Sequence, residues 1–131
     1  MDGQVERYLD QVFDLARQHF SDLQMVARAV TDEWGLIQLR GNFRDLDIAI
    51  TEVMRPTGRK YSYYLLKDGR VLLGLDNSPD RKALRLKFGE TFSQHLYELV
   101  PHQHAEDKLN LKLTEEQTLE DFVNAVIAFA K

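Results

Sequence analysis

Residues 61–75 read YSYYLLKDGRVLLGL. Two apolar runs, Tyr61 to Leu66 and Val71 to Leu75, flank the polar segment Lys67-Asp68-Gly69-Arg70. Asp-Gly is favoured in two-residue hairpin loops because both central residues need a positive φ. The stretch therefore predicts two antiparallel strands joined by a tight turn.

Three more strands are expected upstream of this hairpin. Apolar side chains alternate with their neighbours from Leu23 to Ala29 and from Leu46 to Thr51, and the run from Trp34 to Arg40 is rich in apolar residues. Alternation is typical of a strand with one buried face. With the hairpin, these runs predict a mostly antiparallel sheet of about five strands.

Helical spacing marks both ends of the chain. Apolar residues recur at intervals of three and four from Val5 to His19 and again from Leu119 to Ala130, where Thr118 is placed to cap the first turn. Between them, Leu84, Leu86 and Phe88 are spaced like a strand, and residues 91–99 fit a helix or an extended segment. We expect one α+β domain over residues 1–131, with the N-terminal and C-terminal helices packed on one face of the sheet. The expected core includes Leu9, Val12, Ile48, Ile50, Leu73, Phe122, Val126 and Ile127.

Composition narrows the class of protein. The 131 residues are 44% hydrophobic and 29% charged, a balance typical of a globular domain, and there is no cysteine. Disulfides, thiolate zinc sites and thiol nucleophiles are therefore excluded. The N-terminus lacks the features of a signal peptide, and no apolar stretch approaches the ~20 residues needed to span a bilayer. We expect a cytoplasmic protein that does not associate with a membrane.

Charge is unevenly distributed along the chain. The net charge of −4 divides into −5 for residues 1–54, +6 for residues 55–87 and −5 for residues 88–131. The basic middle third could bind RNA phosphates or an acidic partner protein, although solvated strand edges would show the same pattern.

Common enzyme motifs are absent from the sequence. It has no P-loop, no glycine-rich dinucleotide turn, no His-Glu-x-x-His motif, no EF-hand loop and no Gly-x-Ser-x-Gly elbow. We therefore predict no cofactor.

His102 and His104 form the first candidate catalytic pair. In an extended segment their side chains would project to the same side, where one imidazole could accept a proton from a ribose 2′-OH and the other donate one to the leaving 5′ oxygen. The same spacing suits a metal if Asp76 or Asp107 completes the shell, but two histidines without cysteine are a weak signal, and we predict no metal. A polar surface loop after Pro101 is the third interpretation.

Two further motifs have both structural and functional interpretations. Asp76-Asn77-Ser78-Pro79 follows a predicted strand and suits a plain turn. Tyr61, Tyr63 and Tyr64 lie among basic residues, where tyrosine serves either strand packing or base stacking in single-stranded RNA.

Taken in order, these motifs suggest a family. The Tyr61-Ser62-Tyr63 hairpin with its Asp68-Gly69 turn, Asp76-Asn77-Ser78-Pro79, Pro101-His102-Gln103-His104 and a short C-terminal helix resemble the TumE-type toxins of prokaryotic toxin-antitoxin pairs. The resemblance covers about residues 45–131. It implies a toxin-like protein that acts on RNA and has a cognate antitoxin as its partner.

The leading hypothesis is a metal-independent ribonuclease. His102 and His104 would act as base and acid, with Asp76 or Asn77 orienting an imidazole. The predicted RNA-binding residues are Arg59, Lys60 and Arg70 for phosphates and Tyr63 for a base. The alternative is a non-catalytic module that binds a protein or a nucleic acid, with structural histidines.

Overall fold

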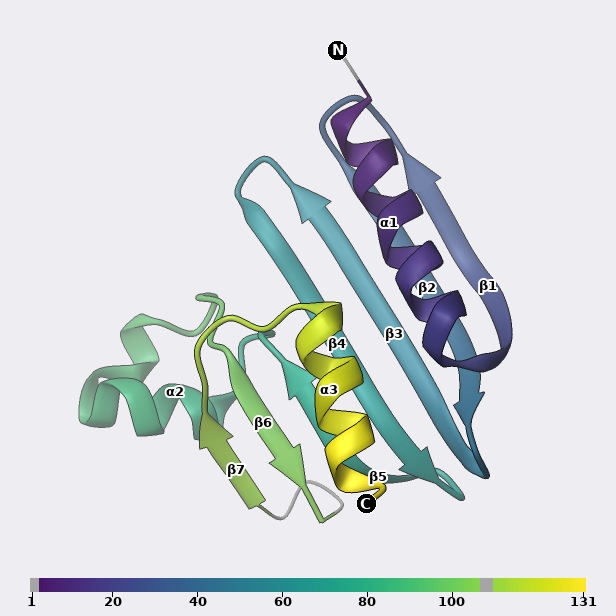
Figure 1. Ribbon diagram of the computed structural model, residues 1–131. Helices are drawn as coiled ribbons and strands as arrows, with labels where there is room; N and C mark the ends of the chain where they lie inside the picture. The colour runs from purple at the N-terminus through teal and green to yellow at the C-terminus, as the bar shows by residue number, and fades with distance from the viewer. Residues whose placement is uncertain (1–2, 107–109) are drawn as a thin grey trace.

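The computed structural model describes residues 3–106 and 110–131. Three α-helices, one 3₁₀ helix and seven strands follow one another along this part of the chain (Figure 1). Their order is α1 (Gln4–His19), β1 (Ser21–Val30), β2 (Gly35–Phe43), β3 (Leu46–Arg55), β4 (Gly58–Lys67), β5 (Arg70–Asp76), α2 (Arg81–Phe88), η1 (Gly89–Gln94), β6 (His102–Ala105), β7 (Asn110–Leu113) and α3 (Leu119–Phe129).

The strands form one antiparallel sheet in the order β1-β2-β3-β4-β5-β6-β7. All five predicted strands are present as β1 to β5, but the expected number of about five was too low. Strands β6 and β7 each have only four residues, and α2 and η1 separate them from β5. Such short strands carry too few alternations to be recognised in a sequence.

The hairpin between β4 and β5 has the predicted turn. Asp68 and Gly69 have φ values of 52° and 77°, so both central residues adopt the positive φ that this tight turn requires. The turn pairs Lys67 with Arg70 and brings Tyr64 opposite Gly74. A Cβ atom on Gly74 would overlap the ring of Tyr64, so the close approach of this ring requires glycine.

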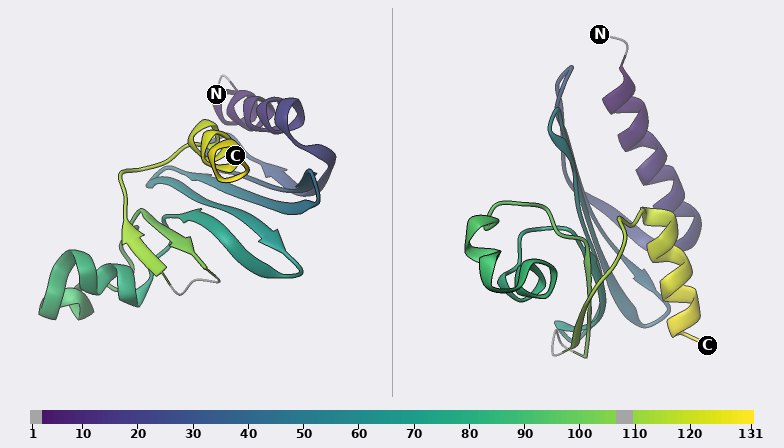
Figure 2. Two further views of the ribbon diagram at one scale, coloured as in Figure 1. Left: turned by 60° about the horizontal axis from the view of Figure 1, so that its bottom comes forward. Right: turned by 90° about the vertical axis from the view of Figure 1, so that its left-hand side faces the viewer.

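Helices cover both faces of the sheet. The terminal helices α1 and α3 lie on one face, as expected, whereas α2 lies on the other (Figure 2). The predicted Thr118 cap is present: its Oγ accepts a hydrogen bond from the Asp121 amide, and the Asp121 carboxylate accepts one from the Thr118 amide. The spacing of Leu84, Leu86 and Phe88 is typical of a strand, but these residues belong to helix α2. The Asp80 side chain caps this helix by accepting a hydrogen bond from Ala83 N.

The main core lies between the sheet and the two terminal helices. It contains the expected Leu9, Val12, Ile48, Ile50, Leu73, Phe122 and Val126. Ile127 was wrongly included, because it is 38% exposed on the outer side of α3. A smaller core under α2 is formed by Ala83, Leu84 and Val100, with Phe88, Phe92 and Leu111 packed against it. Among the described residues, none of the helices combines the length and the apolar character needed to cross a membrane.

Candidate functional site

Asp76, His102 and His104, here called the imidazole cluster, lie together at the ends of β5 and β6. Asp76 pairs directly with His102, and His104 follows two residues later on the same face of β6. The two imidazole rings meet edge to face with centroids 4.7 Å apart. One potential ligand atom from each of the three side chains lies within 4.8 Å of the others.

Hydrogen bonds hold the imidazole cluster in position. His102 Nδ1 lies 2.5 Å from the carbonyl oxygen of Val100, which can only accept, so Nδ1 carries the proton in this contact. Asp76 Oδ1 accepts from Ser78 N at 2.7 Å, and Oδ2 accepts from the Tyr64 hydroxyl at 2.8 Å. Burial and the Asp76 carboxylate raise the pKa of Tyr64, so the phenol remains a donor at neutral pH.

Both imidazoles of the cluster are buried on the face of the sheet that carries α2. Across the strands Tyr64, Gly74, His104 and Leu111 are register partners, and Leu111 packs into the small core beneath α2. His102 and His104 are only 1% and 4% exposed. An RNA phosphate therefore has no access to either ring in this structure.

Asn77 follows Asp76, but its side chain bonds to the backbone of β4. Its Oδ1 accepts from Tyr61 N and its Nδ2 donates to the carbonyl of Arg59, both at 2.8 Å. Both ends of this buried amide are therefore bonded to β4 and do not orient an imidazole. Asp107, the other carboxylate considered for a metal shell, lies outside the described residues.

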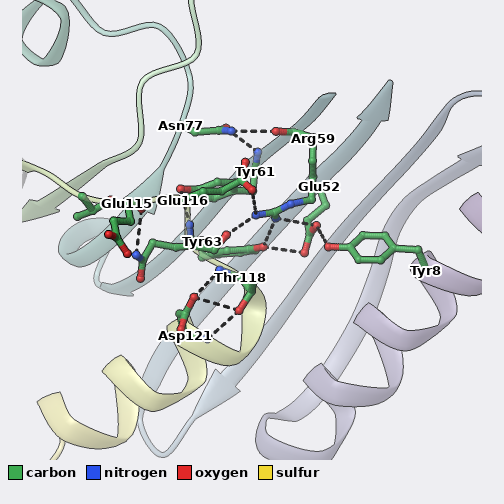
Figure 3. Close-up of polar contacts among 12 residues, drawn as sticks. Tyr8, Glu52, Arg59, Tyr61, Tyr63, Asn77, Glu115, Glu116, Thr118 and Asp121 are labelled. Atoms are coloured by element: carbon green, nitrogen blue, oxygen red, sulfur yellow. Dashed lines mark hydrogen bonds and ion pairs between the residues drawn. The ribbon is translucent and has the colours of Figure 1, made fainter. Parts of the chain in front are cut away.

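A second polar cluster lies in the main core and is called the Glu52 cluster (Figure 3). It comprises Tyr8 of α1, Glu52 of β3, and Arg59 and Tyr63 of β4. The fully buried Glu52 accepts hydrogen bonds from the Tyr8 hydroxyl, from the Tyr63 hydroxyl at 2.7 Å and from Arg59 Nη1 at 3.1 Å. Arg59 Nη2 also donates to the carbonyl of Gln117, just before α3. The cluster therefore ties both terminal helices to the sheet.

The Glu52 cluster combines a fixed ion pair with protonated phenols. Burial raises the pKa of Tyr63 most, and the Glu52 carboxylate raises it further; the same two causes raise the pKa of Tyr8. Burial alone would lower the pKa of Arg59, but Tyr63, Glu52 and Tyr8 raise it by more, so the guanidinium stays charged.

The four residues predicted to bind RNA are not brought together. Arg59 is bonded within the Glu52 cluster, and Tyr63 is 0% exposed, so its ring has no face for a base. Lys60 alternates with Arg59 along β4 and therefore lies on the opposite face of the sheet, beside a hollow of about 250 Å³ that also involves Ser62 and Ser78. Arg70 is exposed in the hairpin turn.

Helix α2 carries a different concentration of positive charge. Four of its eight residues are exposed Lys or Arg, and none is acidic. Two of the arginines lie over the Phe92 ring, Arg85 at 4.5 Å and Arg81 at 5.8 Å. The ring of His95 stacks on Phe88 at 3.6 Å, which places the following turn, with the 94% exposed Tyr97, at the end of this helix. We call Arg81, Lys82, Arg85, Lys87 and Tyr97 the α2 surface.

Sequence reasoning missed two of these features, although each left a signal. Glu52 continues the alternating buried positions of β3 after Ile48 and Ile50. A carboxylate at a position where the alternation predicts an apolar core residue is a signal in the sequence. The cations of the α2 surface were counted in the basic middle third, but the strand-like spacing hid their clustering on one helix. Tyr97 carried no signal beyond its residue type.

Comparisons with protein-family models, with curated proteins and with solved structures gave no match to this chain.

Proposed function

We propose that this protein is an RNA-binding module that holds single-stranded RNA on the α2 surface. The observation that supports this proposal is the presence of four exposed cations and no acidic residue on an eight-residue helix. Phosphate contacts supply most of the affinity of proteins for RNA. The four cations of α2 can make such contacts although the net charge of the whole chain is −4.

The arrangement of charges in the fold also favours this surface. Helix α2 lies on one face of the sheet, whereas α1 and α3 lie on the other (Figure 2). Those two terminal helices carry five carboxylates and two arginines, a net charge of −3: Glu6, Asp10, Asp14, Glu120 and Asp121 against Arg7 and Arg17. A polyanion is therefore attracted to one side of the molecule and repelled from the other.

Tyr97 provides the stacking partner that single-stranded RNA requires. Almost its entire side chain is exposed, so a face of the ring is open to a base. Stacking of a base on an exposed aromatic ring contributes about 1–3 kcal/mol and tolerates any sequence. We accordingly expect binding with little sequence preference.

Cleavage of RNA stays a separate prediction. The convergence of Asp76, His102 and His104 favours it, whereas the burial of both rings opposes it. Incubation of the protein with labelled RNA, followed by gel analysis, tests it directly, with His102→Ala as the comparison. The antitoxin partner is likewise a prediction, tested by co-purification with the product of a neighbouring gene.

Fluorescence anisotropy with a labelled single-stranded RNA, measured over a range of salt concentrations, tests the proposed binding. Removing two phosphate contacts in Lys82→Gln/Arg85→Gln is expected to shallow the slope of log affinity against log salt by about 1.4. Tyr97→Ala should weaken binding by about 5-fold to 160-fold. The control Lys67→Gln/Arg70→Gln removes the same charge from the β4–β5 hairpin and should leave most of the affinity.

Two results would contradict the proposal. The first is no measurable binding by the unmodified protein at low salt. The second is a larger loss in the hairpin variant than in the α2 variant, which would return the RNA site to the region around Arg70.

A further inference from the structure

We propose that Asp76, His102 and His104 bind one zinc ion, which joins the end of β5 to β6 on the face of the sheet that carries α2. This site is separate from the α2 surface, and the inference does not depend on RNA binding. It rests on the convergence of three ligand types that zinc accepts, on their burial and on the hydrogen bonds that hold them.

The spacing of the three ligand atoms is close to that of a zinc site. Because these atoms lie within 4.8 Å of one another, a point exists within about 2.8 Å of all three, and zinc bonds to imidazole nitrogen and carboxylate oxygen measure about 2.0–2.2 Å. Each atom therefore moves inward by less than ~1 Å on binding. Small side-chain rotations cover this distance without changing the pairing of β5 with β6.

The hydrogen bonds around the imidazole cluster are those of a supported metal site. Histidine ligands usually donate their second ring N–H to a carbonyl or carboxylate, which fixes the tautomer and the ring orientation. His102 Nδ1 does this toward the Val100 carbonyl and so leaves the lone pair on Nε2 for a metal. Asp76 is held in the same way by Ser78 N and the Tyr64 hydroxyl.

Burial of both rings keeps an ion at this site away from an RNA substrate. Two imidazoles at 1% and 4% exposure lie against a carboxylate, an arrangement in which a divalent cation offsets the cost of removing these polar groups from water. Two nitrogens and one oxygen suit zinc, whereas Mg²⁺ and Ca²⁺ prefer oxygen ligands alone. Because the ion would bind the folded chain and not the unfolded one, it should raise the thermal stability.

The test is a metal titration of the full chain after treatment with a chelator. Calorimetry with Zn²⁺ should show one ion per chain, and Co²⁺, used as a spectroscopic substitute, should develop visible ligand-field absorption at the same stoichiometry. Zn²⁺ should also raise the thermal midpoint, whereas Mg²⁺ should not.

Variants then locate the ion. His104→Ala and Asp76→Asn each remove one ligand and should weaken Zn²⁺ binding by at least about 100-fold. Tyr64→Phe keeps the ring but removes one hydrogen bond to Asp76, and it should weaken Zn²⁺ binding by about 10-fold. The control His19→Ala removes an exposed histidine from α1 and should bind as the unmodified protein does. If His104→Ala fails to fold, Asp76→Asn and Tyr64→Phe still report on the site.

Two results would overturn the inference. One is the absence of a one-to-one Co²⁺ spectrum in the unmodified protein. The other is a Zn²⁺ affinity of Asp76→Asn within about twofold of the unmodified value, which would assign any binding to surface histidines.

Discussion

Replacement of Glu52 by alanine is expected to lower the free energy of unfolding by about 3–5 kcal/mol, because it breaks a buried ion pair. The carboxylate is fully buried and accepts from three side-chain donors, while the side chain of its partner Arg59 is only 12% exposed. Its loss leaves the Arg59 guanidinium without its buried counter-charge, and the remaining Glu116 carboxylate is 4.0 Å away and 62% exposed. The free energy of unfolding of a native domain is about 5–15 kcal/mol in total, so this substitution removes a large part of the stability.

Urea denaturation followed by far-UV circular dichroism measures this loss. The midpoint should fall while the slope with denaturant stays constant, because the surface exposed on unfolding is unchanged. A matched control is Asp14→Ala, which removes a carboxylate that is 57% exposed and paired with Arg17. Exposed pairs contribute about 0–1 kcal/mol, so the control should remain close to the unmodified protein.

A double-mutant cycle separates the ion pair from the rest of the cluster. Arg59→Met alone leaves Glu52 buried without its cation, so each single variant carries the penalty of an uncompensated charge. The other single variant of the cycle is Glu52→Gln. The double variant Glu52→Gln/Arg59→Met removes both charges and should cost at least about 1 kcal/mol less than the sum of Glu52→Gln and Arg59→Met. Additive values, or a Glu52→Ala variant within 1 kcal/mol of Asp14→Ala, would refute this account.

Two further predictions concern the tyrosines and a glycine. Burial and Glu52 raise the pKa values of Tyr8 and Tyr63 above the usual 10.0, so the unfolded chain releases these protons first. The contribution of these two phenols to stability should therefore be constant below pH 10 and be lost above it, by up to about 1.4 kcal/mol per pH unit for each phenol. In a urea series above about pH 10, Tyr63→Phe should show a smaller slope of stability against pH than the unmodified protein, and equal slopes would contradict this. Gly74→Ala should lower the thermal stability by about 1–3 kcal/mol because its Cβ overlaps the Tyr64 ring. Gly69→Ala, at φ 77° in open space, should cost only about 1 kcal/mol, and a greater loss in this variant would contradict the steric argument.

Local signals were sufficient for much of the fold. Asp68-Gly69 specifies its turn because both residues must adopt positive φ, and it does so wherever the hairpin packs. The Thr118 cap acts within one helical turn of its partner Asp121. Strict alternation of apolar and polar residues from Leu46 onward likewise predicted β3, because one side of that strand faces the main core.

The segment after Asp76 could not be assigned in this way. Leu84 and Leu86 are spaced as on a strand, yet both belong to α2, where Leu84 is buried and Leu86 is 59% exposed. The helix depends on the Asp80 cap and on the packing of Ala83 and Leu84 against Val100, a contact distant in sequence. Strands β6 and β7 also depend on partners, since four residues do not form a stable strand alone.

Some features of the candidate sites could likewise be predicted from the sequence, whereas others depend on the tertiary structure. The sequence determined that His102 and His104 share one side of an extended segment and that positive charge gathers in the middle third, because spacing and composition are properties of the chain alone. Only the tertiary structure decided that these rings are buried, that Asp76 meets them across β5 and β6, and that Arg59 and Tyr63 are enclosed around Glu52 instead of facing solvent. Burial depends on which elements pack over a residue, and that packing is set by the summed contacts of distant segments rather than by any short motif.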